Sequence, residues 1–268
     1  MADTDSLTPR EFRRYGRHLT LPEVGLEGQV RLRRSSALVV GAGGLGSPVL
    51  MYLAAAGIGT LGIVDDDRVD VTNLQRQIVH MTEHVGFDKV KSAVLTLAEV
   101  NPDTRVIPYK LRLDAANVMD LIEPFDLVID GSDNFATRYL LNDACHLAKK
   151  PLVAASLLRF EGQLSTFRAW DKGACYRCLF PDRPPPDLIP RCEEAGILGS
   201  VAGVMGTLQA TEAIKELLGL GESLAGRLLI YDALGATFRT ISVPKDPACA
   251  LCGPQATITD LSGHEKAT

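Results

Sequence analysis

A glycine-rich turn between a short apolar run and a helical pattern is the feature that most constrains this fold. Residues 37–41, ALVVG, form a β-branched apolar run that is typical of a buried parallel strand. Gly41, Gly43 and Gly46 follow in the spacing G-x-G-x-x-G, and residues 44–57 favour a helix that packs closely on a sheet. A strand, a glycine turn and a helix in this order predict the first unit of a doubly wound α/β sheet.

The same alternation of strands and helices continues through the first 156 residues. Further strand patterns occupy 60–65, 104–111, 126–134 and 151–156, and further helical patterns occupy 88–100 and 138–150. Pro108 lacks a backbone N–H, which places its strand towards an edge of the sheet. We therefore predict a Rossmann-like, mostly parallel α/β fold, in which residues 1–34 form an N-terminal arm and helix and residues 35–156 form a nucleotide-binding half.

The pattern changes after residue 156. The expected elements are a half-solvated strand, an exposed loop with five prolines, a long helix and a hairpin, at 160–170, 181–190, 200–219 and 227–243. We expect one continuous sheet that becomes antiparallel towards its end. Residues 157–255 are then the second half of the same domain, and residues 256–268 are predicted to be a disordered tail.

Composition excludes several classes of protein. The formal net charge of −5 and the pI near 5.6 argue against a protein that wraps nucleic acid, which usually presents a basic face. Apolar runs are interrupted well before the roughly 18 residues that a membrane-spanning helix needs. The polar start, MADTDSLTPR, lacks the features of a secretory signal, so we expect a cytoplasmic protein. Six cysteines in a reducing compartment suggest metal binding or chemistry before they suggest disulfides.

The glycine turn predicts a nucleotide site, because its backbone N–H groups and the following helix N-terminus favour a phosphate. Asp65 ends the next strand pattern, where a carboxylate can accept hydrogen bonds from ribose hydroxyls. The turn alone fits NAD, FAD or ATP. The alternative is a glycine turn that only packs a helix on a sheet.

Charged residues beyond Asp65 favour ATP. ATP carries about four negative charges, and a site for attack on its α-phosphate needs several fixed cations. Arg76, in NLQRQ (73–77), can bind phosphate oxygens with its guanidinium, and Lys89 can act as a point charge or as a solvated lysine on a helix. Asp133 follows a strand and can ligate Mg²⁺, cap the next helix, or do both.

Two C-x-x-C pairs predict a structural Zn²⁺ site. The pairs are Cys175 with Cys178 and Cys249 with Cys252, and four thiolates complete a closed tetrahedral site. A redox dithiol would explain one pair but not both. Of the other two cysteines, Cys145 is expected to be a small buried hydrophobic residue. Cys192, in RCEEAG, is equally compatible with a loop cysteine and a nucleophile.

These motifs together resemble one family over nearly the whole chain. The shared segments are RRYGRHLTLPEVG, GAGGLGS, DDDRVDVTNLQRQ, DKV, DGSDN, CYRC, RCEEAGILG and CALCG. The chain resembles the adenylyltransferases that activate ubiquitin-like sulfur-carrier proteins (the MoeB/ThiF/HesA type, related to ubiquitin-activating enzymes). Both cysteine pairs are present, so the molybdopterin-synthase adenylyltransferases look most similar. A sequence that stops at residue 268 leads us to expect no rhodanese-like sulfurtransferase domain.

The resemblance implies roles for individual residues. Gly44 would contact the nucleotide and Asp65 its ribose, and Lys89 would neutralise phosphate charge. Asp133 would position Mg²⁺ with Asn134 beside it. The nucleotide segment would comprise Thr72, where the family usually has serine, followed by Asn73, Leu74, Gln75 and Arg76.

The resemblance also implies a partner and an assembly. Arg17 matches an arginine that the family supplies from the other subunit of a homodimer, and Cys192 matches the cysteine that forms sulfur or thioester links. Residues 157–255 would bind the carrier and hold the zinc staple. The resemblance implies ATP- and Mg²⁺-dependent adenylylation of a carrier that ends in Gly-Gly (MoaD/ThiS-like), for molybdopterin, thiamine or thiolated-tRNA synthesis, with a sulfurtransferase as a candidate sulfur donor.

Three other readings remain open from the sequence. An NAD-dependent oxidoreductase explains the glycines and Asp65, but it does not explain NLQRQ. A tRNA-modifying dehydratase relative fits less well with the acidic charge and the two complete cysteine pairs. A zinc-stabilised scaffold without enzymatic activity is the third. The proline-rich segment 181–195 is expected to be mobile and to be cut first by proteases.

Overall fold

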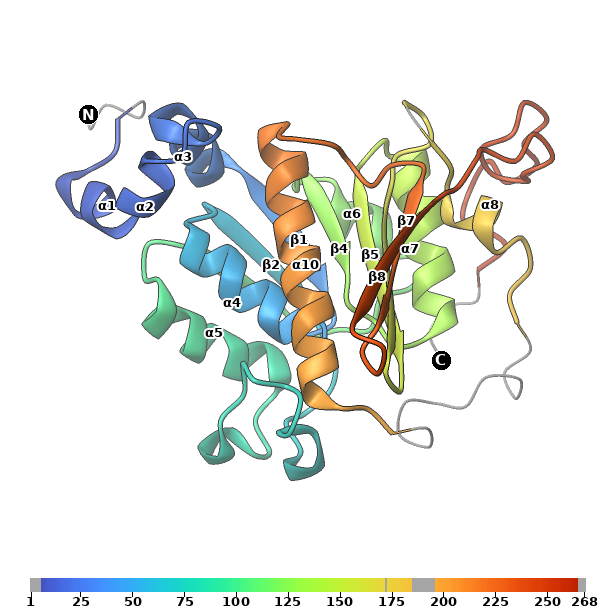
Figure 1. Ribbon diagram of the computed structural model, residues 1–268. Coiled ribbons are helices and arrows are strands. Elements are labelled where there is room, and N and C mark those ends of the chain that lie inside the picture. Colours follow the sequence, from blue (N-terminus) through green and yellow to red (C-terminus); the bar gives the residue numbers. More distant parts are fainter. Residues whose placement is uncertain (1–5, 172, 185–195, 265–268) are drawn as a thin grey trace.

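An eight-stranded sheet organises the chain in the order β3-β2-β1-β4-β5-β6-β7-β8 (Figure 1). The computed structural model describes residues 6–171, 173–184 and 196–264. Strands β1 to β5 are parallel, and β6 to β8 continue the sheet in antiparallel pairing. The bounds are Ser36–Val40 (β1), Thr60–Val64 (β2), Arg105–Tyr109 (β3), Leu127–Asp130 (β4), Leu152–Leu158 (β5), Glu161–Phe167 (β6), Arg227–Asp232 (β7) and Thr237–Ser242 (β8). The predicted α/β fold with one continuous mixed sheet is confirmed.

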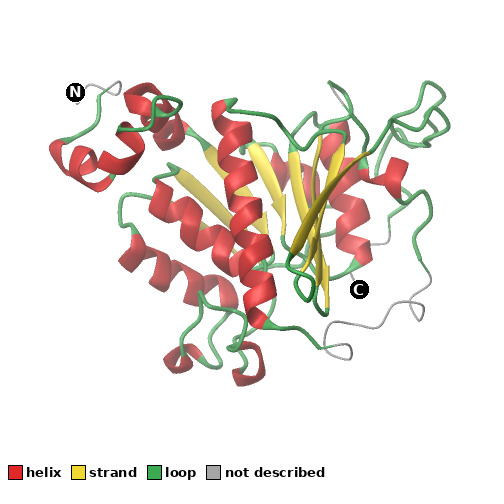
Figure 2. Cartoon of the chain, in the orientation of Figure 1, coloured by secondary structure: helices red, strands yellow, loops and turns green. Residues whose placement is uncertain are grey.

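Helices cover both faces of the parallel half (Figure 2). One face carries α4 (Gly46–Ala56), α5 (Lys89–Val100) and α10 (Gly199–Leu218), and the other carries α6 (Val118–Ile122) and α7 (Phe135–Leu147). Alternate residues of β1 therefore enter different cores: Val39 packs with the first group of helices and Leu38 with the second. A strand that is buried on both faces needs an unbroken apolar run. The run ALVV therefore allowed this buried strand to be predicted from the sequence.

The chain reverses its direction of progress across the sheet between β1 and β4. From β1 the chain adds β2 and β3 on one side, and then it crosses to add β4 and β5 on the other. The loops that leave the carboxyl ends of β1 and β4 meet at this reversal, and the region at their outer edge is called the crevice below. This crevice is where open α/β sheets bind ligands.

The N-terminal arm packs at the opposite end of the sheet. It contains α1 (Pro9–Arg14), α2 (Gly16–Leu19) and α3 (Gly25–Arg34). The Tyr15 hydroxyl accepts a 2.8 Å hydrogen bond from Asn101, and its ring fills the space where Gly57, at the end of α4, lacks a side chain. Both contacts hold the arm beside the C-termini of α4 and α5.

Residues 256–264, the start of the expected disordered tail, are among the described residues, and two of them contact the rest of the domain. Leu261 is buried in the core that α7 shares with β4. Nε2 of His264 lies 2.7 Å from Oδ2 of Asp143, a buried residue of α7. Arg177, in the short helix α8 (Tyr176–Leu179), donates two hydrogen bonds of 2.8 and 2.7 Å to the same carboxylate. Residues 265–268 lie outside the described part of the chain.

The proline-rich loop is only partly described. Residues 181–184 have neither helix nor strand, and 181–183 are exposed. Residues 185–195, which include Cys192 and most of the segment expected to be cut first by proteases, lie outside the described residues. Among the described helices, none combines the length and the apolar composition needed to cross a membrane.

Replacing Asp143 by Asn should destabilise the fold and flatten its response to acid. Burial alone would raise the pKa of Asp143, but hydrogen bonds from His264 and Arg177, with the Arg177 charge, hold that pKa below its ordinary value. A depressed carboxyl pKa gives stability that is present above about pH 4 and is lost as the pH falls through the folded-state pKa. Breaking a buried pair costs about 3 kcal/mol at pH 7. Urea unfolding between pH 3 and pH 7 measures both effects.

The exposed pair of Arg168 with Asp171 provides the control, because its carboxylate side chain is 61% accessible. Asp171→Asn should change the free energy of unfolding by less than about 1 kcal/mol. Equal effects of the two substitutions would contradict the importance of the His264–Asp143–Arg177 contact.

Candidate functional site

The glycine turn of residues 41–46 can be built only from glycine at its two ends. A Cβ on Gly46 would lie 1.8 Å from the carbonyl oxygen of Gly41, and Gly41 has a φ of +94°. A Cβ on Gly41 would lie 2.8 Å from the carbonyl oxygen of Gly131, which follows β4. The turn that follows β1 is thus in close contact with the backbone after β4. Helix α4 begins at Gly46, with its N-terminus towards the crevice.

Asp65 braces this turn from the end of β2. Its Oδ2 accepts a 2.8 Å hydrogen bond from the Ala42 N–H, and its Oδ1 accepts a 2.9 Å hydrogen bond from the Asp67 N–H. Burial raises the pKa of Asp65, although the nearby Lys89 charge and the two backbone hydrogen bonds oppose the shift. A carboxylate has about four acceptor positions, so the predicted contact with ribose hydroxyls is compatible with this bracing role.

The structure brings Arg76 to the glycine turn. A Cβ on Gly44 would lie 3.6 Å from Cγ and Cδ of Arg76, so the arginine stem lies along the turn. The guanidinium donates hydrogen bonds to Oδ1 of Asn73 at 2.8 Å and to the Thr72 carbonyl at 3.3 Å. The short helix η1 (Val71–Asn73) therefore orients the cation beside the expected phosphate position.

Lys89 is the first residue of α5 and is 6% exposed. Its Nζ lies 2.7 Å from Oδ2 of Asp67. A buried ammonium with one exposed carboxylate partner is a fixed positive charge at the edge of the site, whereas a solvated helix lysine would be exposed. The alternative of a solvated lysine is therefore wrong.

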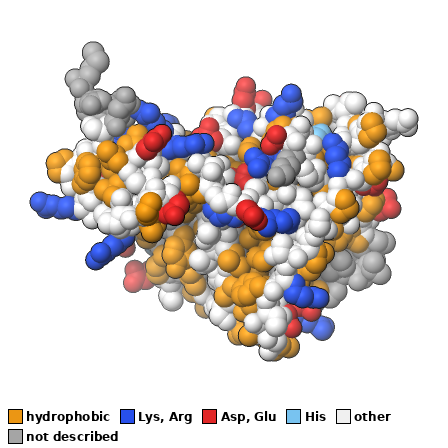
Figure 3. Space-filling view, turned by 45° about the horizontal axis from the view of Figure 1, so that its top comes forward, with side chains coloured by type: hydrophobic (Ala, Val, Ile, Leu, Met, Phe, Trp, Pro, Cys, Tyr) orange, Lys and Arg blue, Asp and Glu red, His pale blue; other side chains and the backbone are white. Residues whose placement is uncertain are grey.

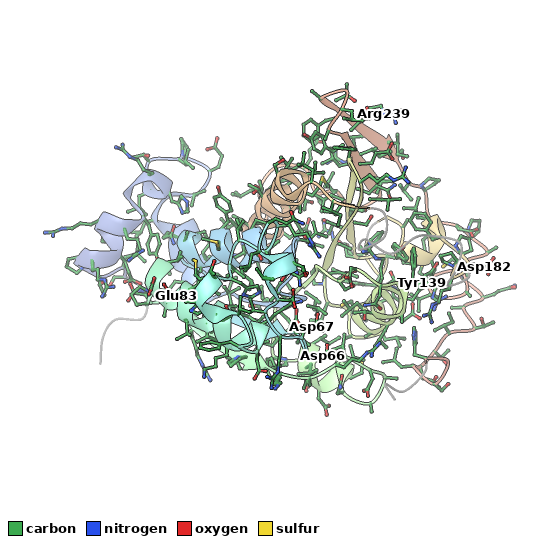
Figure 4. The ribbon with its side chains drawn as sticks, turned by 90° about the horizontal axis from the view of Figure 1, so that it is seen from below. Asp66, Asp67, Glu83, Tyr139, Asp182 and Arg239 are labelled. Carbon is green, nitrogen blue, oxygen red and sulfur yellow. The ribbon has the colours of Figure 1, made fainter. Side chains whose placement is uncertain are left out.

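Three consecutive carboxylates follow β2. One oxygen atom from each of Asp65, Asp66 and Asp67 lies within 4.8 Å of the others. Figure 4 looks onto this end of the molecule and places Asp66 and Asp67 near its centre. Asp66 and Asp67 were not predicted as site residues, although the run DDD at the end of a strand pattern could have indicated them.

Asp133 and Asn134 lie in the loop that follows β4. Asn134 caps α7, because its Oδ1 accepts a 2.9 Å hydrogen bond from the Thr137 N–H. Asp133 is exposed and comes two residues after Gly131, which packs on the glycine turn. The capping alternative thus belongs to Asn134, and Asp133 borders the crevice.

A buried carboxylate beneath this loop, that of Asp130, was not predicted from the sequence. Asp130 is fully buried, and its Oδ1 accepts hydrogen bonds from both the backbone N–H and the hydroxyl of Ser132. Arg138 donates a 3.0 Å hydrogen bond to the Ser132 carbonyl, and its Nε lies 3.8 Å from Oδ2 of Asp130. These contacts set the backbone path that carries Asp133.

The first turn of α10 covers the nucleotide segment. A Cβ on Gly199 would lie 2.2 Å from the Gln75 carbonyl oxygen, and the Ala202 Cβ would be 3.4 Å from a Cβ on Gly44. Gln75 and Arg76, at the end of the segment that runs from Thr72 through Leu74, thereby lie between the glycine turn and α10. Three helices, α4, α5 and α10, begin around the same crevice, and their N-termini add positive potential there.

The four cysteines of the two C-x-x-C pairs meet as predicted. Their Sγ atoms lie within 4.8 Å of one another, with Cys175 3.5 Å from Cys249 and Cys178 3.3 Å from Cys252. Thiolates around a tetrahedral Zn²⁺ at about 2.3 Å are about 3.8 Å apart, so the cluster is compatible with a zinc site. A hydrogen bond between Cys175 and Cys252 lowers the pKa of the Cys252 thiol and raises the pKa of the Cys175 thiol.

Two predicted residues lie apart from the crevice. Arg17 is exposed on α2, beside the C-terminus of α4. The 11 residues of α4 span about 16 Å, so the glycine turn at the other end of α4 is out of reach of Arg17 in the same chain.

Cys145 is 1% exposed in α7, and burial raises the pKa of its thiol, as expected for a small core residue.

Comparisons with known proteins agree with this architecture. The profile of the ThiF family matches residues 15–251. The "Sulfur carrier protein adenylyltransferase" of Thermus thermophilus is 50% identical over 96% of this chain and 97% of its own length. The "Probable adenylyltransferase/sulfurtransferase MoeZ" of Mycobacterium tuberculosis is 50% identical over 97% of this chain, but the chain spans only 66% of that relative. The crystal structure of Escherichia coli MccB with AMPCPP and MccA has a TM-score of 0.80 at 21% identity, covering 93% of this chain and 76% of that one, and shows the same fold.

Proposed function

Because this chain belongs to the ThiF family, we propose that it adenylylates the C-terminal glycine of a ubiquitin-like sulfur-carrier protein, using ATP and Mg²⁺. The observation that carries this proposal is the pair of fixed cations, Arg76 and Lys89, beside a glycine turn at a helix N-terminus. An NAD-dependent oxidoreductase needs no such cations, and the family membership also argues against that alternative.

In the proposed reaction the carboxylate of the carrier tail attacks the α-phosphorus of ATP. A bond forms from the tail oxygen to phosphorus, the bond to the β,γ-diphosphate breaks, and pyrophosphate leaves with the bonding electrons. A carboxylate is already ionised at pH 7, so the site needs no general base. Positioning and charge stabilisation then supply the rate acceleration.

Each residue of the crevice has a role in this proposal. Gly43, Gly44 and the first turn of α4 approach the phosphates with backbone N–H groups, and Asp65 binds the ribose while bracing the turn. Arg76 and Lys89 stabilise the charge that develops on the phosphates. Asp133 binds the Mg²⁺ that accompanies ATP and neutralises phosphate charge, with Asn134 beside it. The Asp65–Asp67 carboxylates border the same position.

A homodimer would complete the site. Arg17 lies at the end of the molecule opposite the glycine turn, so it can reach phosphate only from a second copy of the chain. Exposed apolar side chains on the arm and on α4 and α5 offer a surface for that copy: Phe12, Leu21, Leu26, Tyr52 and Leu95. Figure 3 shows hydrophobic side chains grouped over the arm, at the left.

The relatives' names favour a sulfur carrier, and the molybdopterin, thiamine and thiolated-tRNA pathways all use this chemistry. We place the reaction in the cytoplasm, with a sulfurtransferase as candidate donor. On the face that Figure 3 shows, Lys and Arg alternate with Asp and Glu, in line with a protein partner and not with nucleic acid.

Zinc would hold the second half of the domain together. The four thiols provide a closed donor set, in which a bound ion is structural and has no open position for substrate. The cluster joins α8 to residues 249–252, which follow the β7–β8 hairpin after a short loop, and packs with Ala169 and Leu251.

Isotope exchange between pyrophosphate and ATP tests the proposed function. The protein with Mg²⁺, ATP and a carrier that ends in Gly-Gly should transfer label from pyrophosphate into ATP, and mass spectrometry should find AMP on the carrier. Absence of exchange with every carrier of the three pathways would contradict the proposal.

Arg76→Ala should lower the exchange rate by about two orders of magnitude, the usual cost of losing one preorganised donor. Arg105→Ala, on the exposed edge strand β3, is the matched control and should retain the wild-type rate. A near-normal rate for Arg76→Ala would show that this arginine has no part in catalysis.

Mixing two inactive variants tests whether Arg17 acts in the second subunit. Arg17→Ala and Arg76→Ala should each be inactive, but random mixed dimers would contain one intact site, so about a quarter of all sites should recover. Recovery requires subunit exchange, which a tagged pull-down verifies. If verified mixed dimers remain inactive, Arg17 does not act across the interface.

Metal analysis tests the zinc proposal. The purified protein should contain about one Zn²⁺ per chain. Cys249→Ser should lose most of that zinc and lower the melting temperature, whereas Cys145→Ala, which alters a thiol outside the cluster, should keep it. Full zinc content in Cys249→Ser would exclude the cluster as the site.

A further inference from the structure

Both backbone polar groups of Ala42, inside the glycine turn, are held by side chains. Its N–H donates to Oδ2 of Asp65, and its carbonyl oxygen lies 2.9 Å from Nε2 of His80. Ala42 is fully buried and His80 is 5% exposed, so water does not compete for either contact. The Ala42 carbonyl shares one planar peptide group with the Gly43 N–H, so its orientation decides where that N–H points.

His80 is itself held by α5. Its Nδ1 lies 2.8 Å from the hydroxyl of Ser92, and the same hydroxyl lies 2.9 Å from Nδ1 of His84. A carbonyl oxygen only accepts, so Nε2 of His80 carries the proton and Nδ1 of a neutral ring accepts from Ser92. The Ser92 oxygen can then accept from Nδ1 of His84. Each donor along this path meets an acceptor.

The surroundings keep the His80 ring neutral. Burial lowers the pKa of His80 to about 4, and the charges of Lys89 and His84 act in the same direction, while the hydrogen bond to Ala42 opposes them. A neutral ring has one donor and one acceptor, which is the set that Ala42 and Ser92 require.

A second path links the same residue, Ala42, to the same helix. Asp65 accepts from Ala42 on one oxygen and from the Asp67 N–H on the other, and Asp67 pairs with Lys89 at the start of α5. The glycine turn is therefore fastened to α5 on both of its faces, through a carboxylate path that ends in Lys89 and a histidine path that ends in Ser92.

We propose that His80 is a positioning residue of the nucleotide site, which acts through the Ala42 carbonyl to orient the glycine turn towards ATP. This inference rests on the proposed function. It goes beyond it by assigning a role in ATP binding to a side chain that contacts neither ATP nor carrier.

The test compares two substitutions of His80. His80→Leu removes the donor and leaves a buried carbonyl unpaired, so KM for ATP should rise about tenfold while KM for the carrier stays within about twofold. His80→Gln can place its Nε2 donor near the Ala42 carbonyl and should restore most of the ATP affinity. A role in stability alone would not produce this separation of the two KM values.

Thr104→Val is the matched structural control. The Thr104 hydroxyl donates a 2.9 Å hydrogen bond to the Ile58 carbonyl, also buried, but beyond the C-terminus of α5. This variant should lose melting temperature without any change in KM for ATP. An equal rise in KM for Thr104→Val, a normal KM for His80→Leu, or a Gln variant as weak as Leu would each overturn the proposal.

Two further measurements keep the test decisive. If His80→Leu does not fold, Ser92→Ala removes the partner that orients the ring and should raise KM for ATP in the same direction; an unchanged value would overturn the proposal. Calorimetric measurement of ATP binding with Mg²⁺, without carrier, separates the proposal for His80 from the proposed function. A wild-type protein that binds ATP without pyrophosphate exchange would contradict the proposed function, and the His80 variants would still be judged by their affinity for ATP.

Discussion

The contact of backbone with backbone between the ends of β1 and β4 is the constraint on which the site depends. Gly46 approaches the Gly41 carbonyl, and Gly41 approaches Gly131, at distances that no Cβ could tolerate. This approach lets α4 begin immediately after the turn, so that its N–H groups face the crevice. Any residue with a side chain at these positions would push α4 away from β1 and open the ligand site.

Around that contact, the fold concentrates positive potential by two means. Three helices start beside the crevice. Two cations lie there as well: Arg76 is positioned by hydrogen bonds, and Lys89 is positioned by burial. Carboxylates partly balance these charges: Asp67 faces Lys89, and Asp65 faces the turn. Because the charges are held before a ligand arrives, little reorganisation is needed when phosphate charge develops.

Local patterns in the sequence predicted the parts of the structure that depend on local physics. The apolar run before Gly41, the glycine spacing and the paired C-x-x-C motifs each specify geometry over a few residues, and the structure confirms the strand, the turn and the cysteine cluster. The tail could not be predicted in this way. Leu261 and His264 are ordered by contacts with α7, more than a hundred residues earlier in the chain, and nothing near residue 260 indicates them.

The buried polar residues were hidden for the same reason. His80 gains its partners, Ala42 and Ser92, from other elements, and Asp130 pairs with Arg138 of α7 in addition to the nearby Ser132. Arg17 could not be placed from the sequence for a different reason. Its distance from the glycine turn depends on where the N-terminal arm packs. Only the resemblance to a family had suggested that it acts from a second chain, and that assignment stays a prediction.

A Zn²⁺ ion held by the cysteine cluster would close the stretch from Cys178 to Cys249 into a ring, which contains α10 and the β7–β8 hairpin. Both anchors of the ring stand on residues packed into the rest of the protein, Cys175 and Leu251 among them. Residues added to or removed from the proline-rich stretch would therefore change the circumference of the ring without displacing its anchors, because lengthening a loop carries only a slowly growing entropic cost. Relatives of this protein can be expected to differ in length there, and to recognise different partners, on an otherwise unchanged frame.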